Sequence, residues 1–373
     1  MTSEEGALPR PADQGEEAQT TPVRRRLFSA RFSTRLLSAP GGLLLFVFAL
    51  QLIKAGATAA LPLLSALDAA GPVNALGFGW LGAYLSLSGS PVAAVGISLL
   101  AGGSLSVNEA FAAVGGSRLG ASFIVLAAGY VLYLGGRRNA DGLSIGVIAL
   151  LTTFTTQGPA TALGLLSLHY GWLDGVRFTP PGGALDAVDR LYGPPVEAVD
   201  AMLPAALVFA AGIGVLLASF ALFDRALPRL EAGSPGFERI VARLDGKWVM
   251  FAAGCAVTAM TLSVSISLTL LVPLSLKGYL RRQQVIPYVM GANITTFVDT
   301  LAGALALGGA AAFTVVLTEM LAVTAISAAI LFVAYDTYAR GILGLASKVT
   351  HNRRTFSVFL GAIVAIPAVL LLV

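Results

Sequence analysis

The sequence predicts an all-α integral membrane protein built from two repeats of opposite orientation. Of its 373 residues, 56% are hydrophobic and only 12% are charged, and the mean hydropathy is +0.81. An average soluble domain carries about 25% charged residues. Several apolar stretches reach the roughly 20 residues that a helix needs to cross a hydrocarbon core. The order of motifs in the first half of the chain returns in the second half, which suggests the repeat.

Small residues and short basic clusters narrow the class further. Glycine occurs 42 times and, with Ala and Ser, fills the apolar stretches, which is typical of helices that pack closely or break inside a bundle. The net charge of +4 comes from basic clusters beside apolar stretches, where orientation signals lie, so nucleic-acid binding is not expected. The lone Cys255 cannot form an intrachain disulfide.

Residues 1–40 are expected to form a disordered cytoplasmic tail. The segment is polar, contains Pro and Glu, and leads to the first apolar stretch. A cleavable signal peptide would reach its apolar region much sooner. The tail is assigned to the cytoplasm because positive charge beside a span favours that side, and five arginines lie there: Arg24, Arg25, Arg26, Arg31 and Arg35.

The first repeat is expected over residues 41–170. At the middle of its second apolar block, Ser88-Gly89-Ser90-Pro91 forms a helix-breaking cluster, which predicts a re-entrant hairpin of two half-helices. A later stretch is interrupted at Gly115-Gly116-Ser117-Arg118. The expected elements are a span at 42–67, the hairpin at 72–105, the broken span at 107–134 and a span at 143–169.

The second repeat is expected over residues 202–335, after an acidic, Pro-rich extracytoplasmic loop at 171–201. Basic residues stand at both ends of its hairpin, so this hairpin opens toward the cytoplasm and the repeat is inverted. Residues 336–373 are expected to be a basic cytoplasmic loop and a C-terminal span. The elements are a span at 202–222, the hairpin at 248–276, a broken span at 285–307 and a span at 311–334. The predicted location is the inner (plasma) membrane, multi-pass, with a cytoplasmic N-terminus.

Internal similarity supports this division. Leu87-Ser88-Gly89-Ser90 aligns with Leu262-Ser263-Val264-Ser265, and the alignment continues without gaps to Gly116 and Gly291. Chance matches are common in Leu- and Gly-rich segments. The supporting feature is therefore the shared order, a pair of serines followed by the glycine of a broken helix.

At these residues the sequence resembles the type II sodium-dependent phosphate cotransporter family, as a divergent member. Each half of that family carries Gln-Ser-Ser-Ser and, one hairpin arm later, Gly-Ala-Asn-Ile-Gly-Thr. Residues 291–296, Gly-Ala-Asn-Ile-Thr-Thr, are close to the second motif, and the serines lie at the family's spacing. Leu87 and Leu262 replace the motif glutamines, and the first-half glycine motif is altered at 116–120.

The resemblance implies symport of phosphate, or a related small anion, with Na⁺ by alternating access at paired hairpin tips. Hydroxyls and backbone amides at half-helix ends can replace the hydration shells of both ions, although such hydroxyls can also merely bond their own helix. The expected substrate-binding residues are Ser88, Ser90, Ser263, Ser265 and Arg118. The expected ion-binding residues are Ser267, Thr269, Asn293, Thr295, Thr296 and Asp299, with Gly291 and Asn293 breaking the helix there.

Arg118 stands where the second half has Asn293. A charge at the bilayer centre costs about 2.5 to 3.5 kcal/mol on insertion scales and needs a partner. Arg118 can hold an anionic substrate through its planar fork or substitute for a lost cation site. The structural alternative is that it pairs with Asp299 or Glu319. In another span, Gln157-Gly158-Pro159 predicts a kink within a Thr-rich run.

The alternative function is a proton-coupled or uncoupled carrier, or a channel, for a different solute on the same fold, with Asp299 and Glu319 as titrating groups. An enzyme is not expected, because His169 and His351 lie at distant span ends and no nucleophile, base or transition-metal constellation is evident. Apart from a coupling ion no cofactor is expected. The expected partners are a small anion, Na⁺ and the lipid bilayer, and the oligomeric state is open.

Overall fold

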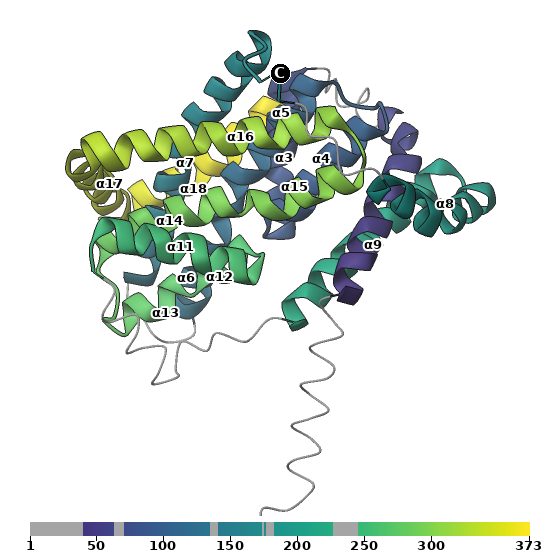
Figure 1. Cartoon of the computed structure of the whole chain (residues 1–373). Coiled ribbons are helices and arrows are strands. Elements are labelled where there is room, and N and C mark those ends of the chain that lie inside the picture. Colours follow the sequence, from purple (N-terminus) through teal and green to yellow (C-terminus); the bar gives the residue numbers. More distant parts are fainter. Residues whose placement is uncertain (1–39, 63–70, 135–140, 174, 177–182, 227–244) are drawn as a thin grey trace, which may run out of the picture.

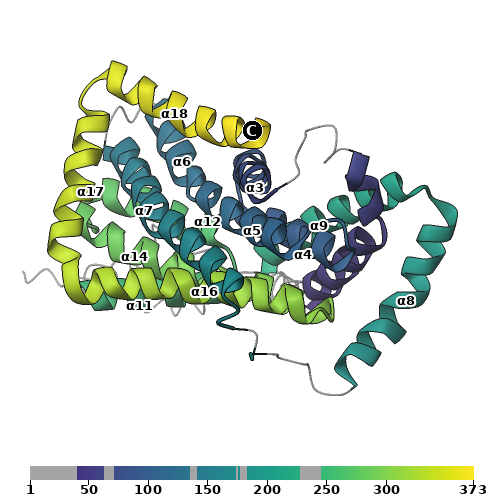
Figure 2. The same ribbon diagram turned by 90° about the horizontal axis from the view of Figure 1, so that it is seen from above.

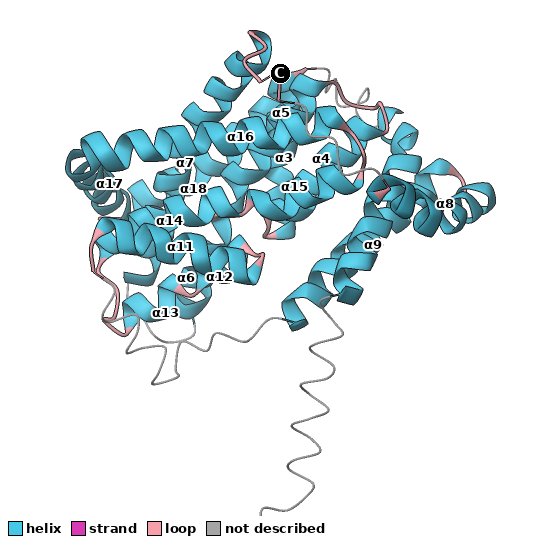
Figure 3. Cartoon of the chain, viewed as in Figure 1, coloured by secondary structure: helices cyan, strands magenta, loops and turns pink. Residues whose placement is uncertain are grey.

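A computed structural model describes residues 40–62, 71–134, 141–173, 175–176, 183–226 and 245–373, and every regular element in them is a helix (Figure 3). The predicted tail, residues 1–40, lies outside the described residues except for its last position. Within these residues, five helices are long and apolar enough to cross a membrane: Val107–Leu132, Ala205–Phe223, Arg282–Ala306, Ala310–Thr350 and Arg353–Leu372. Their number and composition indicate a multi-pass membrane protein.

The first helical hairpin joins α3 (Pro72–Ser86) to α4 (Gly89–Ala101), which pack against each other. The chain reverses at Leu87, which has a left-handed conformation with φ 51°, and at the extended Ser88. Pro91 lies in the first turn of α4, where a missing backbone N–H costs no helical hydrogen bond. The Ser-Gly-Ser-Pro cluster therefore breaks the helix where the sequence predicts it.

The second hairpin joins α11 (Lys247–Thr261) to α12 (Val264–Thr269) and α13 (Leu271–Leu276). Its reversal lies at Leu262, with φ 46°, followed by the extended Ser263, whose hydroxyl accepts a hydrogen bond from the Ile266 N–H at 3.3 Å. Leu87 and Leu262 are the two non-glycine residues with positive φ in the described chain. Both hairpins thus turn on a leucine in a conformation that costs an L-residue about 1–2 kcal/mol.

The broken spans break at other positions than the sequence indicates. The first consists of α5 (Val107–Ala121) and α6 (Phe123–Leu134), and the second of α14 (Arg282–Thr295) and α15 (Phe297–Ala306). The breaks lie at Ser122 and Thr296, and the helices continue through Gly115–Arg118 and Gly291–Asn293. The reason is packing, because a Cβ on Gly116 or Gly291 would collide with a backbone carbonyl of α3 or α11.

Two segments expected as loops are helical. α8 (Ala184–Met202) lies in the expected loop 171–201, and α17 (Tyr335–Thr350) in the part of residues 336–373 that is expected to be a loop before the C-terminal span. Both helices are amphipathic, and the charged and polar residues among their apolar ones keep the average hydropathy low, so hydropathy alone does not reveal them. Figure 2 shows α17 running crosswise between α16 and α18, and α8 standing at the opposite end of the molecule.

One long helix, α7, lies at the centre of the bundle and packs against six other described helices. α7 (Asp141–His169) contacts α5, α6, α13, α14, α16 and α17, and Figure 1 shows it in the middle of the bundle. The other described helices are Pro40–Ala55, α9 (Ala205–Ala226), α16 (Ala310–Ala329) with a π-helical continuation at Ile330–Ala334, and α18 (Arg353–Leu372), which packs on α3.

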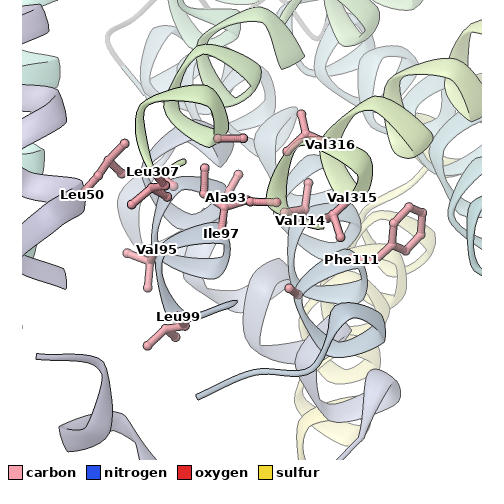
Figure 4. Packing of buried hydrophobic residues seen from close by; sticks show 14 of the residues in the cluster. Leu50, Ala93, Val95, Ile97, Leu99, Phe111, Val114, Leu307, Val315 and Val316 are labelled. Carbon is pink, nitrogen blue, oxygen red and sulfur yellow. The ribbon is translucent and has the colours of Figure 1, made fainter. Parts of the chain in front are cut away.

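Apolar side chains fill the spaces between these helices in two large clusters. One joins α4, α5, α15 and α16, where Ile97, Val114 and Val315 are fully buried (Figure 4). The other joins α6, α7, α12, α13 and α14 around residues such as Ile148 and Val289. Several polar groups between these helices, among them Arg118, Gln157 and Glu319, are consequently buried.

Replacing Gly79 of α3 by valine is expected to destabilise the protein, because a Cβ at this position would collide with the Ala113 carbonyl of α5. Overpacking of this kind costs about 1–3 kcal/mol. The measurement is the midpoint of thermal unfolding of the purified protein in detergent. Gly214→Val on α9 is the matched control, since nothing lies within 4 Å of a Cβ there. Equal midpoints for the two variants would contradict the assigned packing.

Candidate functional site

Arg118 is the largest of the fully buried side chains and lies near the C-terminal end of α5. Its Nη1 donates to Thr296 Oγ1 at 3.0 Å and more weakly to Ser90 Oγ at 3.5 Å, and its Nη2 donates to Thr300 Oγ1 at 2.5 Å. The guanidinium therefore joins the start of α4 to the break between α14 and α15. Its Nε has no hydrogen-bond partner among the described residues.

Arg118 is also paired with Asp299. The distance from its Nη2 to Asp299 Oδ1 is 3.9 Å, and the Asp299 side chain is 10% exposed. The same Oδ1 accepts hydrogen bonds from Thr300, at 2.5 Å from the backbone N–H and 2.8 Å from the hydroxyl. The guanidinium also lies over the ring of Phe297, 4.5 Å from its centroid. Of the two acidic partners that the sequence leaves open, the structure selects Asp299.

A cavity of about 440 Å³ reaches Asp299 from one side. It is lined mainly by apolar side chains of the helix Pro40–Ala55 and of α9, including Phe46, Phe220 and Phe223, and it also touches Leu262 at the second hairpin tip. Asp299 thus forms part of the cavity wall, whereas Arg118 is buried behind it.

The two hairpin tips touch close to this group. Ser265 Oγ, in the first turn of α12, donates a hydrogen bond of 2.9 Å to the carbonyl of Leu87. Ser90 extends from the first tip to Arg118, whereas Ser88 and Ser263 lie at the reversals themselves. The four predicted substrate-binding serines therefore gather at the tips, but only Ser90 contacts Arg118.

The six predicted ion-binding residues do not form one group. Thr296 and Asp299 join Arg118. Thr269 and Thr295 donate to carbonyls of their own helices, which is the alternative considered for such hydroxyls. Ser267 is fully buried and bonds the hydroxyls of Thr258 and Tyr288, which lie on α11 and α14. Because α14 continues through Gly291 and Asn293, it frees no carbonyls there for a cation.

Asn293 belongs to a separate polar chain. Its Nδ2 donates to Thr153 Oγ1 at 3.0 Å, and Thr153 is 2.5 Å from Ser122 Oγ at the break between α5 and α6. Sequence reasoning missed Thr153, Ser122 and Thr300. The Thr-rich run of α7 was the available signal for Thr153, but it gave no indication of which face of the helix turns inward.

A second buried group surrounds Glu319 of α16, which is 0% exposed. Its Oε1 accepts hydrogen bonds from Gln157 Nε2 and, at 2.9 Å, from Thr161 Oγ1, both on α7. Glu319 Oε2 and Gln157 Oε1 have no partner in the described part of the chain. Gly115 of α5 leaves room for this group, because a Cβ there would lie 2.7 Å from Thr161 Oγ1.

The described helices and these interior charges define a multi-pass helical membrane protein with a polar centre. No protein-family model matches the chain, and no curated protein and no solved structure is found to be similar to it. The resemblance to type II sodium-dependent phosphate cotransporters therefore depends on the sequence motifs alone.

Removing one partner of the Arg118–Asp299 pair is expected to destabilise the protein strongly, because it leaves a buried charge without compensation. Such changes cost about 3–5 kcal/mol. Arg118→Gln and Asp299→Asn each lower the unfolding midpoint in detergent, and the double variant loses less than the sum of the two. Strictly additive losses would show that the two side chains are not coupled.

Proposed function

We propose that the chain is a secondary transporter that carries a small oxyanion, phosphate or a chemical relative, and that Arg118 holds the anion. The observation that carries this proposal is the buried guanidinium of Arg118, which lies where a hairpin tip meets a broken helix. Its Nε–H group has no hydrogen-bond partner among the described residues. Planar guanidinium groups suit the paired oxygens of phosphate and carboxylate. Broken helices near the membrane centre are a common setting for substrate sites.

The proposed transporter consists of two structural repeats, and the backbone supports this arrangement. Positions that carry unusual backbone features recur at one constant separation in the sequence. They are the left-handed Leu87 and Leu262, the positive-φ Gly103 and Gly278, and the glycines that face a neighbouring backbone, Gly116 and Gly291. One half of the capping interaction recurs at the same separation, because the side chains of Glu109 and Gln284 accept hydrogen bonds from the backbone N–H groups of Ser106 and Arg281.

The inverted orientation is supported by where the hairpins open. The base of the first hairpin lies beyond the N-terminal end of α16, near the bond from Ser104 Oγ to the Ala57 carbonyl. The base of the second lies at the other end of α16, where Lys247 Nζ donates to the Leu331 carbonyl at 2.7 Å. Figure 1 shows the two hairpins entering from these opposite ends. Tips that meet from opposite sides suit alternating access.

Asp299 is the internal counter-ion in this proposal. In this structure the Asp299 carboxylate is paired with the Arg118 guanidinium, the group to which an anion would bind. An incoming oxyanion displaces the carboxylate, and the hydroxyls around Arg118 then help to replace the anion's lost hydration. The tip contact from Ser265 to Leu87 must loosen for the anion to enter from one side.

Na⁺ is the coupling ion that the resemblance implies, and it remains part of the proposal. Coupling to protons is a second candidate, favoured by the buried carboxyl groups of Asp299 and Glu319, whereas the hydroxyls of Thr269 and Thr295 bond their own helices. A carrier or channel for a different solute on the same fold is the remaining alternative.

Proteoliposomes with purified protein are expected to accumulate radiolabelled phosphate under an inward Na⁺ gradient or an inward proton gradient. Arg118→Ala should reduce accumulation to the level of empty vesicles while the protein is still inserted, because the anion loses its counter-charge. Arg340→Ala, on the exposed part of α17, is the matched control and should transport normally. Full uptake by Arg118→Ala would remove Arg118 from the site, and no uptake by the unmodified protein under either gradient would refute phosphate as substrate.

A further inference from the structure

Glu319 is a buried carboxyl group for which the proposed anion site has no use. It is 0% exposed and bonds Gln157 and Thr161 of α7, and it forms no ion pair within 4 Å in the described residues. Its Oε2 has no hydrogen-bond partner there. An ionised carboxylate without a partner is costly to bury, and such groups are usually neutralised.

The helices packed against α16 bring few charges toward Glu319. They are α4, α5, α7, α14, α15 and the π-helical segment at Ile330–Ala334. α5 carries Arg118, which has an electrostatic effect on Glu319 but is already paired with Asp299 of α15. Glu109 lies at the start of α5, and Asp141 and His169 lie at the two ends of α7.

The other neighbours add no counter-charge. α14 carries Tyr288, which bonds Ser267, and Arg282 at its N-terminus, one helix length from the break at Thr296. α4 and the π-helical segment contain no ionisable side chain. One guanidinium thus faces two carboxyl groups, so that one of the two lacks a compensating charge.

Counting hydrogens at Thr161 indicates how Glu319 is neutralised. Thr161 Oγ1 lies 2.9 Å from Glu319 Oε1 and 3.0 Å from the main-chain carbonyl of Gln157, yet the hydroxyl has a single hydrogen for these two acceptors. Both bonds are complete if Glu319 carries a proton on Oε1. The carboxylic acid then donates to Thr161, and Thr161 donates to the Gln157 carbonyl.

We propose that Glu319 is a proton-binding site that couples proton movement to anion transport, with Gln157 and Thr161 as the residues that position its carboxyl group. The step is a simple protonation, in which a proton from water on one side binds the carboxylate oxygen, and the neutral acid later releases it to water on the other side. No other bond forms or breaks. The coupling rests on the proposed function of the chain as an anion carrier.

The sign of the coupling follows from the neighbouring Arg118. Ionised Glu319 places a second negative charge near the guanidinium and opposes an incoming anion, whereas protonated Glu319 does not. Protonation therefore favours anion binding, and by linkage a bound anion favours protonation. The proton and the anion travel in the same direction, and anion affinity falls as Glu319 loses its proton at higher pH.

Infrared spectroscopy of the full-length protein tests the protonation without reference to transport. The carbonyl stretching band of a buried carboxylic acid should be present at neutral pH, absent in Glu319→Gln, and retained in Glu109→Gln, which changes the partly exposed carboxyl of a helix cap. The absence of the band in the unmodified protein overturns the proposal. So does a band that disappears in Asp299→Asn but persists in Glu319→Gln.

Glutamine closely mimics a protonated glutamate, so Glu319→Gln should fold. If it does not, Thr161→Val serves as the second variant, because it removes the hydrogen-bond acceptor of the acid. The carbonyl band of Glu319 should then move to the position of a free acid, and an unmoved band overturns the assignment.

Transport measurements test the coupling separately. Glu319→Gln should still exchange phosphate between the two sides of the vesicle, should lose accumulation driven by a proton gradient, and should lose the pH dependence of phosphate affinity. Undiminished proton-driven accumulation in this variant overturns the coupling. Absence of phosphate transport by the unmodified protein refutes phosphate as the substrate instead, and the infrared result then still decides whether Glu319 holds a proton.

Discussion

The burial of one positive charge constrains the centre of this protein more than any other interaction. An unpaired guanidinium in a membrane interior is too costly to persist, so every polar group near Arg118 is arranged around it. Asp299 supplies the counter-charge, Thr296 and Thr300 accept from the two terminal nitrogens, and the ring of Phe297 covers one face. These partners all come from the region where α14 gives way to α15. The break in that span and the charge on α5 therefore depend on each other.

Close backbone contact sets the depth at which this charge lies. Gly79 and Gly116 let α3 and α5 approach until their main chains touch, and Gly254 and Gly291 do the same for α11 and α14. Association without a hydrophobic driving force relies on such contacts. The hairpins that these helices carry reverse at leucines in a left-handed conformation. Strained backbone of this kind persists where surrounding contacts hold it, and it is often found at sites that move.

The sequence located features with a strong local cause and missed those decided by packing. Serine, glycine and proline together break a helix wherever they occur, so the first hairpin tip was predictable. A glycine alone is ambiguous, because it can break a helix or admit a neighbouring backbone, and the expected breaks at Gly116 and Gly291 turned out to be packing contacts. The choice between Asp299 and Glu319 as partner of Arg118 depends on how α5, α15 and α16 are rotated, and the bond between Gln157 and Glu319 depends on the rotation of α7 and α16. No local pattern encodes these rotations. The amphipathic α8 was hidden by Pro194 and Pro195 within it.

For the proposed anion carrier, the charges in the interior limit which ion can accompany the anion. With Arg118 and Asp299 paired, and with Glu319 neutral as proposed, the centre has no net charge. An anion that enters adds negative charge to a region of low dielectric, where a net charge is unfavourable and where its movement works against the membrane potential. Asp299 and Glu319 are the two groups at hand that can offset this charge by holding protons.

A bound Na⁺ would serve equally well electrostatically, but it needs several oxygens directed at one point, and the hydroxyls of Thr269, Thr295 and Ser267 are engaged elsewhere. The arrangement of oxygens around the centre, rather than the presence of hydroxyls in the sequence, therefore decides which cation can be coupled.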